Sequence, residues 1–272
     1  TGIQVNQQGG AETGLSAETS RAYTFGGVFE PKLGNLGTLS LGVDYFNLLV
    51  ENGVSQLSFS TILSQCYDSS PADFAAKADT CALITRGTTA PFGLVVKTGY
   101  VNISNAAVSG LDFTARYTVP LFNGRFRLNA AVTKFDERYS QTLPTDVIRN
   151  VIGSVGNPEW TGTFEASYQK DRWTLRYGVE WLDATYTTAF QLNTTEAIRS
   201  TYYLQTPDYY LHSASVRYQG DKFGVIVGVR NLTNAELPEI SSGANNRIGN
   251  VPLYSGVDYV GRTFFVNVTT AF

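Results

Sequence analysis

Two cysteines are the residues in this chain whose type and spacing most directly suggest covalent chemistry. Cys66 and Cys81 lie 15 residues apart in a polar stretch rich in Asp and Ala. The cysteine count is even, and neither a C-x-x-C motif nor a nearby histidine accompanies them. This pattern favours a disulfide in an oxidising compartment over two free thiols. Closing a loop of this size would contribute about 3 kcal/mol by the chain-entropy model.

The other reactive side chains do not form a recognisable catalytic or metal-binding pattern. His212 is the only histidine, and one imidazole without cysteine or carboxylate company is not a zinc or catalytic site. No nucleophile, base and orienting group fall into a known arrangement. The glycine-rich residues 241–247 have neither GxGxxG nor P-loop spacing. We therefore expect no enzyme activity, no metal site and no cofactor.

Charged side chains recur at alternate positions within otherwise apolar stretches. They are Arg116, Arg127, Arg176, Glu180, Arg217 and Arg230. Alternation places such residues on one face of a strand, opposite the apolar residues. Side chains of this kind either contact a solute or form ladders that brace a wall, and the sequence leaves both open. As candidate solute contacts we take Arg127, Arg176, Glu180 and Arg230.

Composition narrows the class of protein further. The 272 residues include 13% aromatics, 16% charged residues and no methionine. Without a methionine or a signal-like N-terminus, we expect the chain to be a mature or excised piece of a longer product. There is no run of 18 apolar residues, which excludes helical membrane spans and leaves a closed barrel as the way through a bilayer. The net charge of −3 argues against a nucleic-acid partner.

Period-two alternation of apolar and polar residues predicts an all-β fold with nine strands. The strands are expected at residues 22–29, 39–46, 111–118, 126–133, 160–168, 173–181, 210–218, 223–230 and 263–272. Short turns and long loops join them alternately. The longest loop, from about residue 50 to about residue 107, holds both cysteines and is expected to contain one or two short helical pieces, such as residues 70–79.

The alternation of short and long connections is typical of an outer-membrane β-barrel, which has short periplasmic turns and long extracellular loops. Aromatic residues near the strand ends, such as Tyr117, Trp160, Trp173 and Trp181, suit an interfacial belt. A soluble β-sandwich also alternates. We disfavour it because one face of strand after strand is almost entirely apolar while the other carries the charged residues.

Five motifs along the chain make a more specific resemblance. They are ETSRAYTFG at residues 18–26, VDYFN at 43–47, SGLDF at 109–113, GVRNLTN at 228–234 followed by Pro238, and GRTFFVNV at 261–268. In order and spacing they resemble the C-terminal half of TonB-dependent outer-membrane receptors. The two-cysteine loop also resembles one found in a subset of that family. Ala17 and Thr270 depart from the proline and the hydrophobic residue usual at these positions.

The resemblance implies a 22-strand transmembrane antiparallel barrel with an N-terminal plug, in the bacterial outer membrane. Such receptors import a scarce nutrient, such as siderophore-bound iron, a vitamin or an oligosaccharide, with energy delivered by TonB. Nothing in residues 1–272 looks like the plug, so we expect this chain to be the C-terminal portion of the barrel. Its implied partners are the remainder of the receptor, TonB through the plug, lipid and a small-molecule solute. The alternative is a passive porin or a purely structural barrel.

Overall fold

The computed structural model describes residues 2–7, 15–67, 81–86, 92–141, 148–187, 190, 195–241 and 243–270. Two compact units divide the chain. The first comprises Thr1–Arg21, Leu48–Ala107 and Tyr139–Arg149, and the second comprises Ala22–Asn47, Val108–Arg138 and Asn150–Phe272. Each is described separately below. Among the residues described, no helix is long and apolar enough to cross a membrane.

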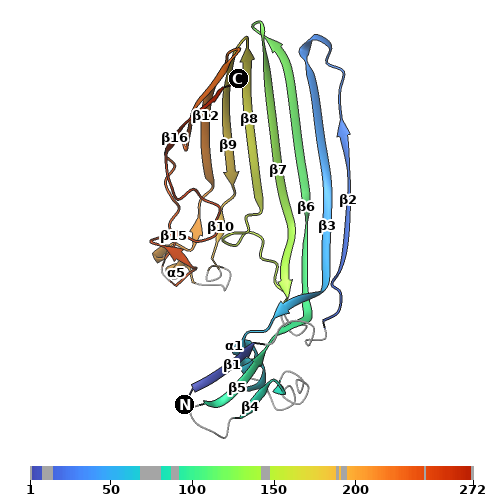
Figure 1. Ribbon diagram of the computed structural model, residues 1–272, viewed down its shortest axis with the longest axis vertical. Coiled ribbons are helices and arrows are strands. Elements are labelled where there is room, and N and C mark those ends of the chain that lie inside the picture. The colour runs from blue at the N-terminus through green and yellow to red at the C-terminus, as the bar shows by residue number, and fades with distance from the viewer. Residues whose placement is uncertain are drawn as a thin grey trace. The chain divides into compact units, whose positions relative to one another are not determined.

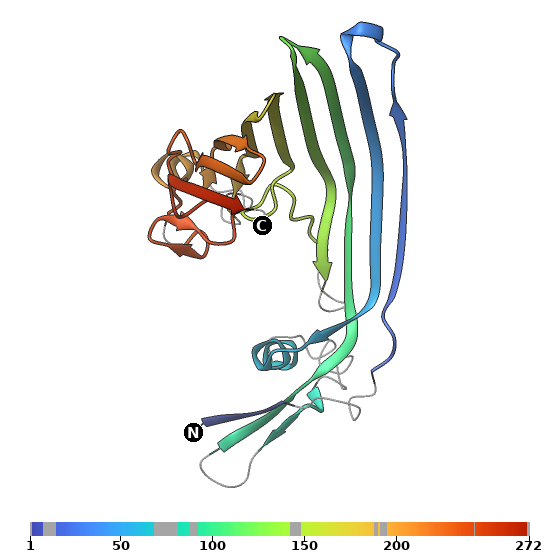
Figure 2. The ribbon, with the colours of Figure 1, turned by 45° about the horizontal axis from the view of Figure 1, so that its top comes forward.

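Nine of the described strands form one sheet, and their order in space follows their order in the chain (Figure 1). All nine predicted strands are present, the last as far as Thr270, since residues 271–272 of its predicted range lie outside the described residues. From one edge to the other they are β2 (Thr19–Phe29), β3 (Thr38–Gln56), β6 (Tyr100–Leu121), β7 (Gly124–Gln141), β8 (Trp160–Lys170), β9 (Trp173–Leu182), β12 (Tyr209–Gln219), β13 (Phe223–Arg230) and β16 (Thr263–Thr270). Consecutive strands from β7 to β16 pair antiparallel. Figure 2 shows the strands after β7 curving out of the plane of β6 and β7.

Tight turns join the strands at one end of the sheet. Phe122 and Asn123 between β6 and β7 both have positive φ, 47° and 61°, which matches the type of two-residue turn that fits the twist of a hairpin. Asp171, with φ 51°, begins the equally short turn between β8 and β9. The 3-10 helix η2 (Gly34–Leu36) lies between β2 and β3. The sequence predicted all three of these short connections.

Three strands extend far beyond the bounds that the sequence predicted. β3 continues to Gln56 and β6 starts at Tyr100, both inside the interval expected to be loop, and β7 continues to Gln141. In these extensions the two faces differ little in polarity, so the period-two signal is lost although the backbone pairing goes on. The expected helical piece at 70–79 lies outside the described residues. The interval does contain a helix, α1 (Phe59–Tyr67), but the sequence did not predict its position.

The first unit has a small core of its own. β1 (Gly2–Gln7) pairs parallel with β5 (Phe92–Thr98), and β4 (Ile84–Arg86) pairs antiparallel with β5 on its other side. Leu57, Ile62 of α1 and Val96 of β5 are buried together. Val101 of β6 also packs against this core, so apolar packing holds the helix against both the small sheet and the start of β6.

The register of the nine-stranded sheet separates an apolar face from a polar face. On the apolar face, Val227 lies opposite Val216 and Val266. On the polar face, Ser213 lies opposite Gly178 and Arg230. Many apolar-face side chains are exposed, including Phe25 at 66% and Val266 at 67%. An exposed apolar surface that continues over strand after strand needs an apolar environment.

Candidate functional site

Aromatic side chains border the apolar face at both ends of the strands. Trp173 and Tyr218 lie 4.9 Å apart between ring centroids at one end, and Trp181 stacks on Tyr210 at 6.5 Å at the other. Trp173 and Trp181 are separated by eight residues of β9, about 26 Å of strand at ~3.3 Å per residue. This spacing approaches the apolar band of about 25 Å that outer-membrane barrels present to lipid. The apolar face therefore has the dimensions and borders of a membrane-spanning surface.

The polar face of the second unit holds a cavity of about 500 Å³. Its polar lining comes from five neighbouring strands, β6, β7, β8, β9 and β12, and consists of Thr114, Arg116, Asn129, Thr163, Glu165, Arg176, Glu180 and Ser213. Gly178 also lines it. Alternation brings these side chains to one face, and the small residues Gly178 and Ser213 leave the space between the longer ones. We call this cavity the wall pocket.

Two of the four candidate solute contacts, Arg176 and Glu180, line the wall pocket. Arg176 makes an ion pair with Glu165 on the neighbouring strand. The two side chains are 59% and 34% exposed, and ion pairs this accessible contribute about 0–1 kcal/mol. The guanidinium is therefore held loosely enough to exchange its partner.

The third candidate, Arg230, lies beside the pocket rather than in it. Its Nε donates a hydrogen bond to Asp258 Oδ2 at 3.1 Å, and its Nη2 lies 3.8 Å from Glu180 Oε2. Glu180 thus connects Arg230 to the wall pocket. The sequence does not single out Asp258, because it lies in a loop with no periodic signal.

The fourth candidate, Arg127, does not line the pocket. It is exposed on the same polar face, opposite Ser167 of β8. Within the part of the chain that the structure describes, neither Arg127 nor the pocket residue Arg116 has a carboxylate partner within ion-pair distance. The sequence also missed Asn129, which lines the pocket and could have been found from its alternation with apolar neighbours.

His212 lies on the apolar face, away from the wall pocket. Its Nδ1 is 2.6 Å from Tyr177 Oη, and the two rings are 5.9 Å apart. Each polar group thus satisfies the other on a surface where water is excluded. Among the described residues, no group of three or more His, Cys, Asp or Glu side chains could hold a metal ion.

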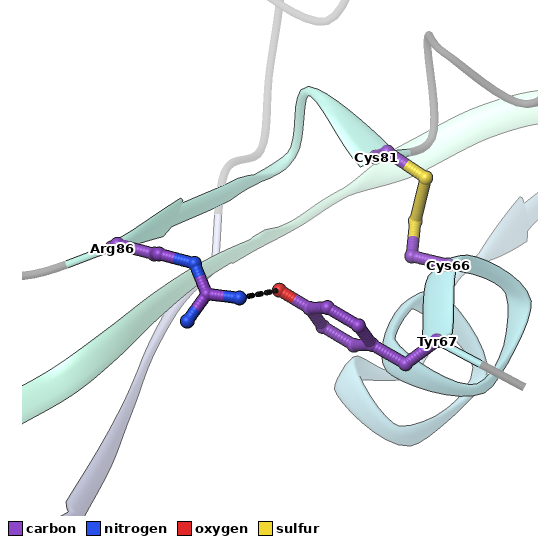
Figure 3. The surroundings of a disulfide bond; sticks show 4 residues. All are labelled: Cys66, Tyr67, Cys81 and Arg86. Atoms are coloured by element: carbon purple, nitrogen blue, oxygen red, sulfur yellow. Dashed lines mark hydrogen bonds between the residues drawn. A yellow bond between two sulfur atoms is a disulfide. The ribbon is translucent and has the colours of Figure 1, made fainter. Parts of the chain in front are cut away.

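The predicted disulfide is confirmed (Figure 3). Cys66 at the end of α1 is bonded to Cys81, with Cα atoms 5.5 Å apart. Beside it, Arg86 Nη2 donates a hydrogen bond to Tyr67 Oη at 3.4 Å, and the guanidinium carbon lies 5.9 Å from the tyrosine ring. The disulfide and the Arg86 contact both link α1 to the chain around β4. The end of the helix is therefore fixed at two adjacent points.

Comparison with known proteins agrees with this geometry. A family model described as "TonB dependent receptor-like, beta-barrel" matches residues 1–232. A mutant of the ferric enterobactin receptor of Pseudomonas aeruginosa is similar in structure, with a TM-score of 0.59 and 18% identity over 95% of this chain and 32% of that one. The pyoverdine outer-membrane receptor of the same organism has a TM-score of 0.51 and 17% identity, over 95% of this chain and 30% of that one. A search of curated protein sequences found no match.

The banded apolar face and the charged polar face together define an outer-membrane β-barrel protein, with short periplasmic turns and long extracellular loops. The family match covers most of the chain. This chain belongs to the TonB-dependent receptor family, whose members are receptors and transporters of the Gram-negative outer membrane. It spans about a third of the length of the solved receptors it resembles.

Proposed function

We propose that residues 1–272 are the C-terminal part of the wall of a receptor that imports a scarce nutrient with TonB-supplied energy. The plug and the other strands would come from the remainder of the receptor. This proposal is supported by the family match and by the fact that the similar solved receptors are about three times as long. The plug would then contact the polar face, and lipid would cover the apolar face.

We further propose that the solute is an anionic iron–siderophore complex rather than a vitamin or an oligosaccharide. The observation that carries this is the pair Arg116 and Arg127, two guanidinium groups on the polar face without a described carboxylate partner. Arg176 adds a third positive charge whose partner is exchangeable. Guanidinium groups bind oxyanions through strong charge-assisted hydrogen bonds. The two solved neighbours are, by their names, receptors for ferric enterobactin and pyoverdine.

The test uses the full-length receptor, expressed in a strain that lacks its own siderophore receptors. Uptake of radioactive iron is measured with ferric enterobactin and ferric pyoverdine as probes. Replacing both Arg116 and Arg127 by Gln should weaken the apparent affinity roughly tenfold or more, because a hydrogen bond to a charged group contributes about 1.5–3 kcal/mol. The control is Arg172→Gln, which removes an arginine paired with Asp221 in the turns.

Deleting TonB separates the proposed function from its alternative. An energised receptor should stop accumulating iron in a TonB-deficient strain. Uptake that continues unchanged there would identify a passive porin. Uptake that needs TonB but is indifferent to the two arginines would refute the anionic solute and leave the receptor function standing.

A further inference from the structure

The 231–262 segment, of which the structure describes all but residue 242, folds back against the polar face. Tyr209 and Leu211 of β12 are buried to 7% and 2% exposure together with Val257 of the segment. Further apolar contacts come from Leu182 of β9 and from Ala235, Leu237 and Val251 of the segment. Tyr209, Leu211 and Leu182 share the polar-face alternation of the wall-pocket residues. The segment therefore covers the outer end of the wall above the pocket.

The reversal starts at Asn231, directly after β13. This residue is fully buried and has a φ of 55°, a left-handed conformation that asparagine tolerates better than most residues. Its Oδ1 accepts a hydrogen bond from Ala235 N at 2.7 Å. Leu232 N donates to His212 O at 2.8 Å. The chain is thus turned inward at once and is tied to the neighbouring strand. In Figure 1, β14 (Arg247–Ile248) and β15 (Val251–Pro252) lie beyond the ends of β9 and β12.

Asp258 ties the far end of the segment to the wall. Its carboxylate accepts the hydrogen bond from Arg230 Nε at 3.1 Å, and its Oδ1 accepts a second from Val260 N at 3.0 Å. Its own backbone N–H donates to Tyr209 Oη at 3.4 Å. The Asp258 side chain is only 9% exposed. Because the carboxylate is largely desolvated, its ion pair is screened far less than those on the open wall.

Arg230 lies between two carboxylates, and its interactions with them differ in strength. Glu180 lines the wall pocket, is 58% exposed and lies 3.8 Å away, whereas Asp258 is nearly buried and lies at 3.1 Å. Distance and burial both favour Asp258 as the principal partner. The residue that holds the segment is therefore in contact with the pocket lining through its weaker partner.

We propose that Arg230 and Asp258 form a positioning pair that holds the 231–262 segment over the outer wall and so limits access to the wall pocket. The role of the pair in limiting solute access rests on the proposed receptor function, whereas the test of the pair does not depend on it. Breaking the pair loosens this end of the segment, so that Leu211 is exposed more often and the pocket becomes more accessible from outside. Retaining a positive charge at position 230 preserves the closure.

The test measures segment opening directly, in cells that display the full-length receptor. Leu211→Cys provides a reporter thiol on the covered wall, while Cys66 and Cys81 are already bonded to each other. The rate of labelling by a membrane-impermeant maleimide follows the population of the open form. Adding Asp258→Asn should raise this rate roughly tenfold or more, since it removes a charge-assisted hydrogen bond. Asp221→Asn, which breaks the exposed Arg172 pair, is the matched control and should leave the rate unchanged.

The labelling rates of the variants distinguish results that support the Arg230–Asp258 pair from results that overturn it. Faster labelling with Asp258→Asn, no change with Asp221→Asn, and a rate near the parent value with Arg230→Lys support the pair. An unchanged rate with Asp258→Asn, or an equal rise in the control, overturns it. If Asp258→Asn fails to assemble, Arg230→Gln against Arg172→Gln decides by the same criterion. No solute is involved, so a failed uptake experiment would count against the proposed function alone.

Discussion

Single residues on the apolar face show how polar atoms can be accommodated where lipid replaces water. Tyr177 and His212 bond to each other in the middle of this face, which avoids the cost of two unpaired polar groups. Lys134 lies farther along, where its Nζ is 2.6 Å from Asp136 and 6.0 Å from the centroid of the Trp160 ring. A charge at this position belongs to the border of the apolar band. Which polar side chains the apolar face accepts at a given position therefore depends on how deep that position lies in the membrane.

Arginine substitutions on adjacent residues should test the assignment of the two faces. Tyr177→Arg places a charge in lipid near mid-membrane and should cost about 2–4 kcal/mol. Gly178→Arg points into the wall pocket, where the nearest atom to its Cβ is the rotatable Ser213 Oγ at 2.9 Å, and should be milder. Urea unfolding of the refolded full-length receptor in lipid measures both. Equal losses would mean that the faces are assigned the wrong way round.

Close packing between strands leaves little space for a side chain at one glycine of the wall. A Cβ at Gly228 would lie 2.4 Å from the Phe265 ring of β16 and 2.8 Å from Ser215 Cβ of β12. The phenylalanine covers the glycine on the polar face, so the β13 backbone is enclosed from both sides. Gly27 on β2, in contrast, has no atom within 4 Å of such a Cβ. The two glycines therefore differ in their tolerance of a side chain although both lie within strands.

Gly228→Val should weaken the pairing of β13 with its neighbours by about 1–3 kcal/mol, the usual cost of overpacking. The ring of Phe265 can turn away, but the Cβ of Ser215 cannot. Gly27→Val is the comparison variant and should cost less, because the added Cβ meets no atom of β3. Heat-induced mobility shifts of the full-length receptor on gels would report the difference. The prediction is wrong if both variants show the mobility shift at the same temperature.

The disulfide should matter for the extracellular element that carries it and not for the wall. Replacing Cys66 and Cys81 by Ser removes up to about 3 kcal/mol of loop constraint, but leaves the buried cluster of Leu57, Ile62 and Val96 intact. We expect normal assembly, faster proteolysis of the loop and altered solute affinity. Assembly failure, or labelling that finds both thiols free in native membranes, would show that the loop has another role.

At the scale of the whole molecule, the described sheet has two open edges. β2 and β16 each have a single neighbour within it, and both are exposed along their length. Unpaired edges bordered by apolar side chains invite association with other chains. In a closed barrel both edges pair and disappear. In the proposed receptor, the stability of this chain is therefore tied to the strands that would complete the barrel.

Expression of residues 1–272 alone should consequently give aggregates instead of a heat-resistant barrel in detergent. Co-expression with the remaining strands of the receptor should rescue assembly, because it supplies partners for both edges. Size-exclusion chromatography and heat modifiability are the measurements. A monodisperse, folded species of the isolated 272 residues would contradict the prediction.

The features that depend on local pattern could be predicted from the sequence alone. Period-two alternation located all nine strands and sorted Arg176 and Glu180 onto the polar face, since the side-chain direction in a strand repeats every two residues. The even cysteine count predicted the Cys66–Cys81 bond. The motifs identified the family. None of these inferences required knowing which distant residues meet.

Features that depend on contacts between residues far apart in the chain became visible only in the folded structure. The extensions of β3, β6 and β7 are held by backbone pairing with neighbours and leave no alternation to detect. Arg230 meets Asp258, 28 residues away, because Asn231 turns the chain back onto the polar face. Nothing in the pattern of residues 231–262 signals this fold, since its apolar residues are irregularly spaced. Its packing onto Tyr209 and Leu211 is set by the position of the wall against which it folds.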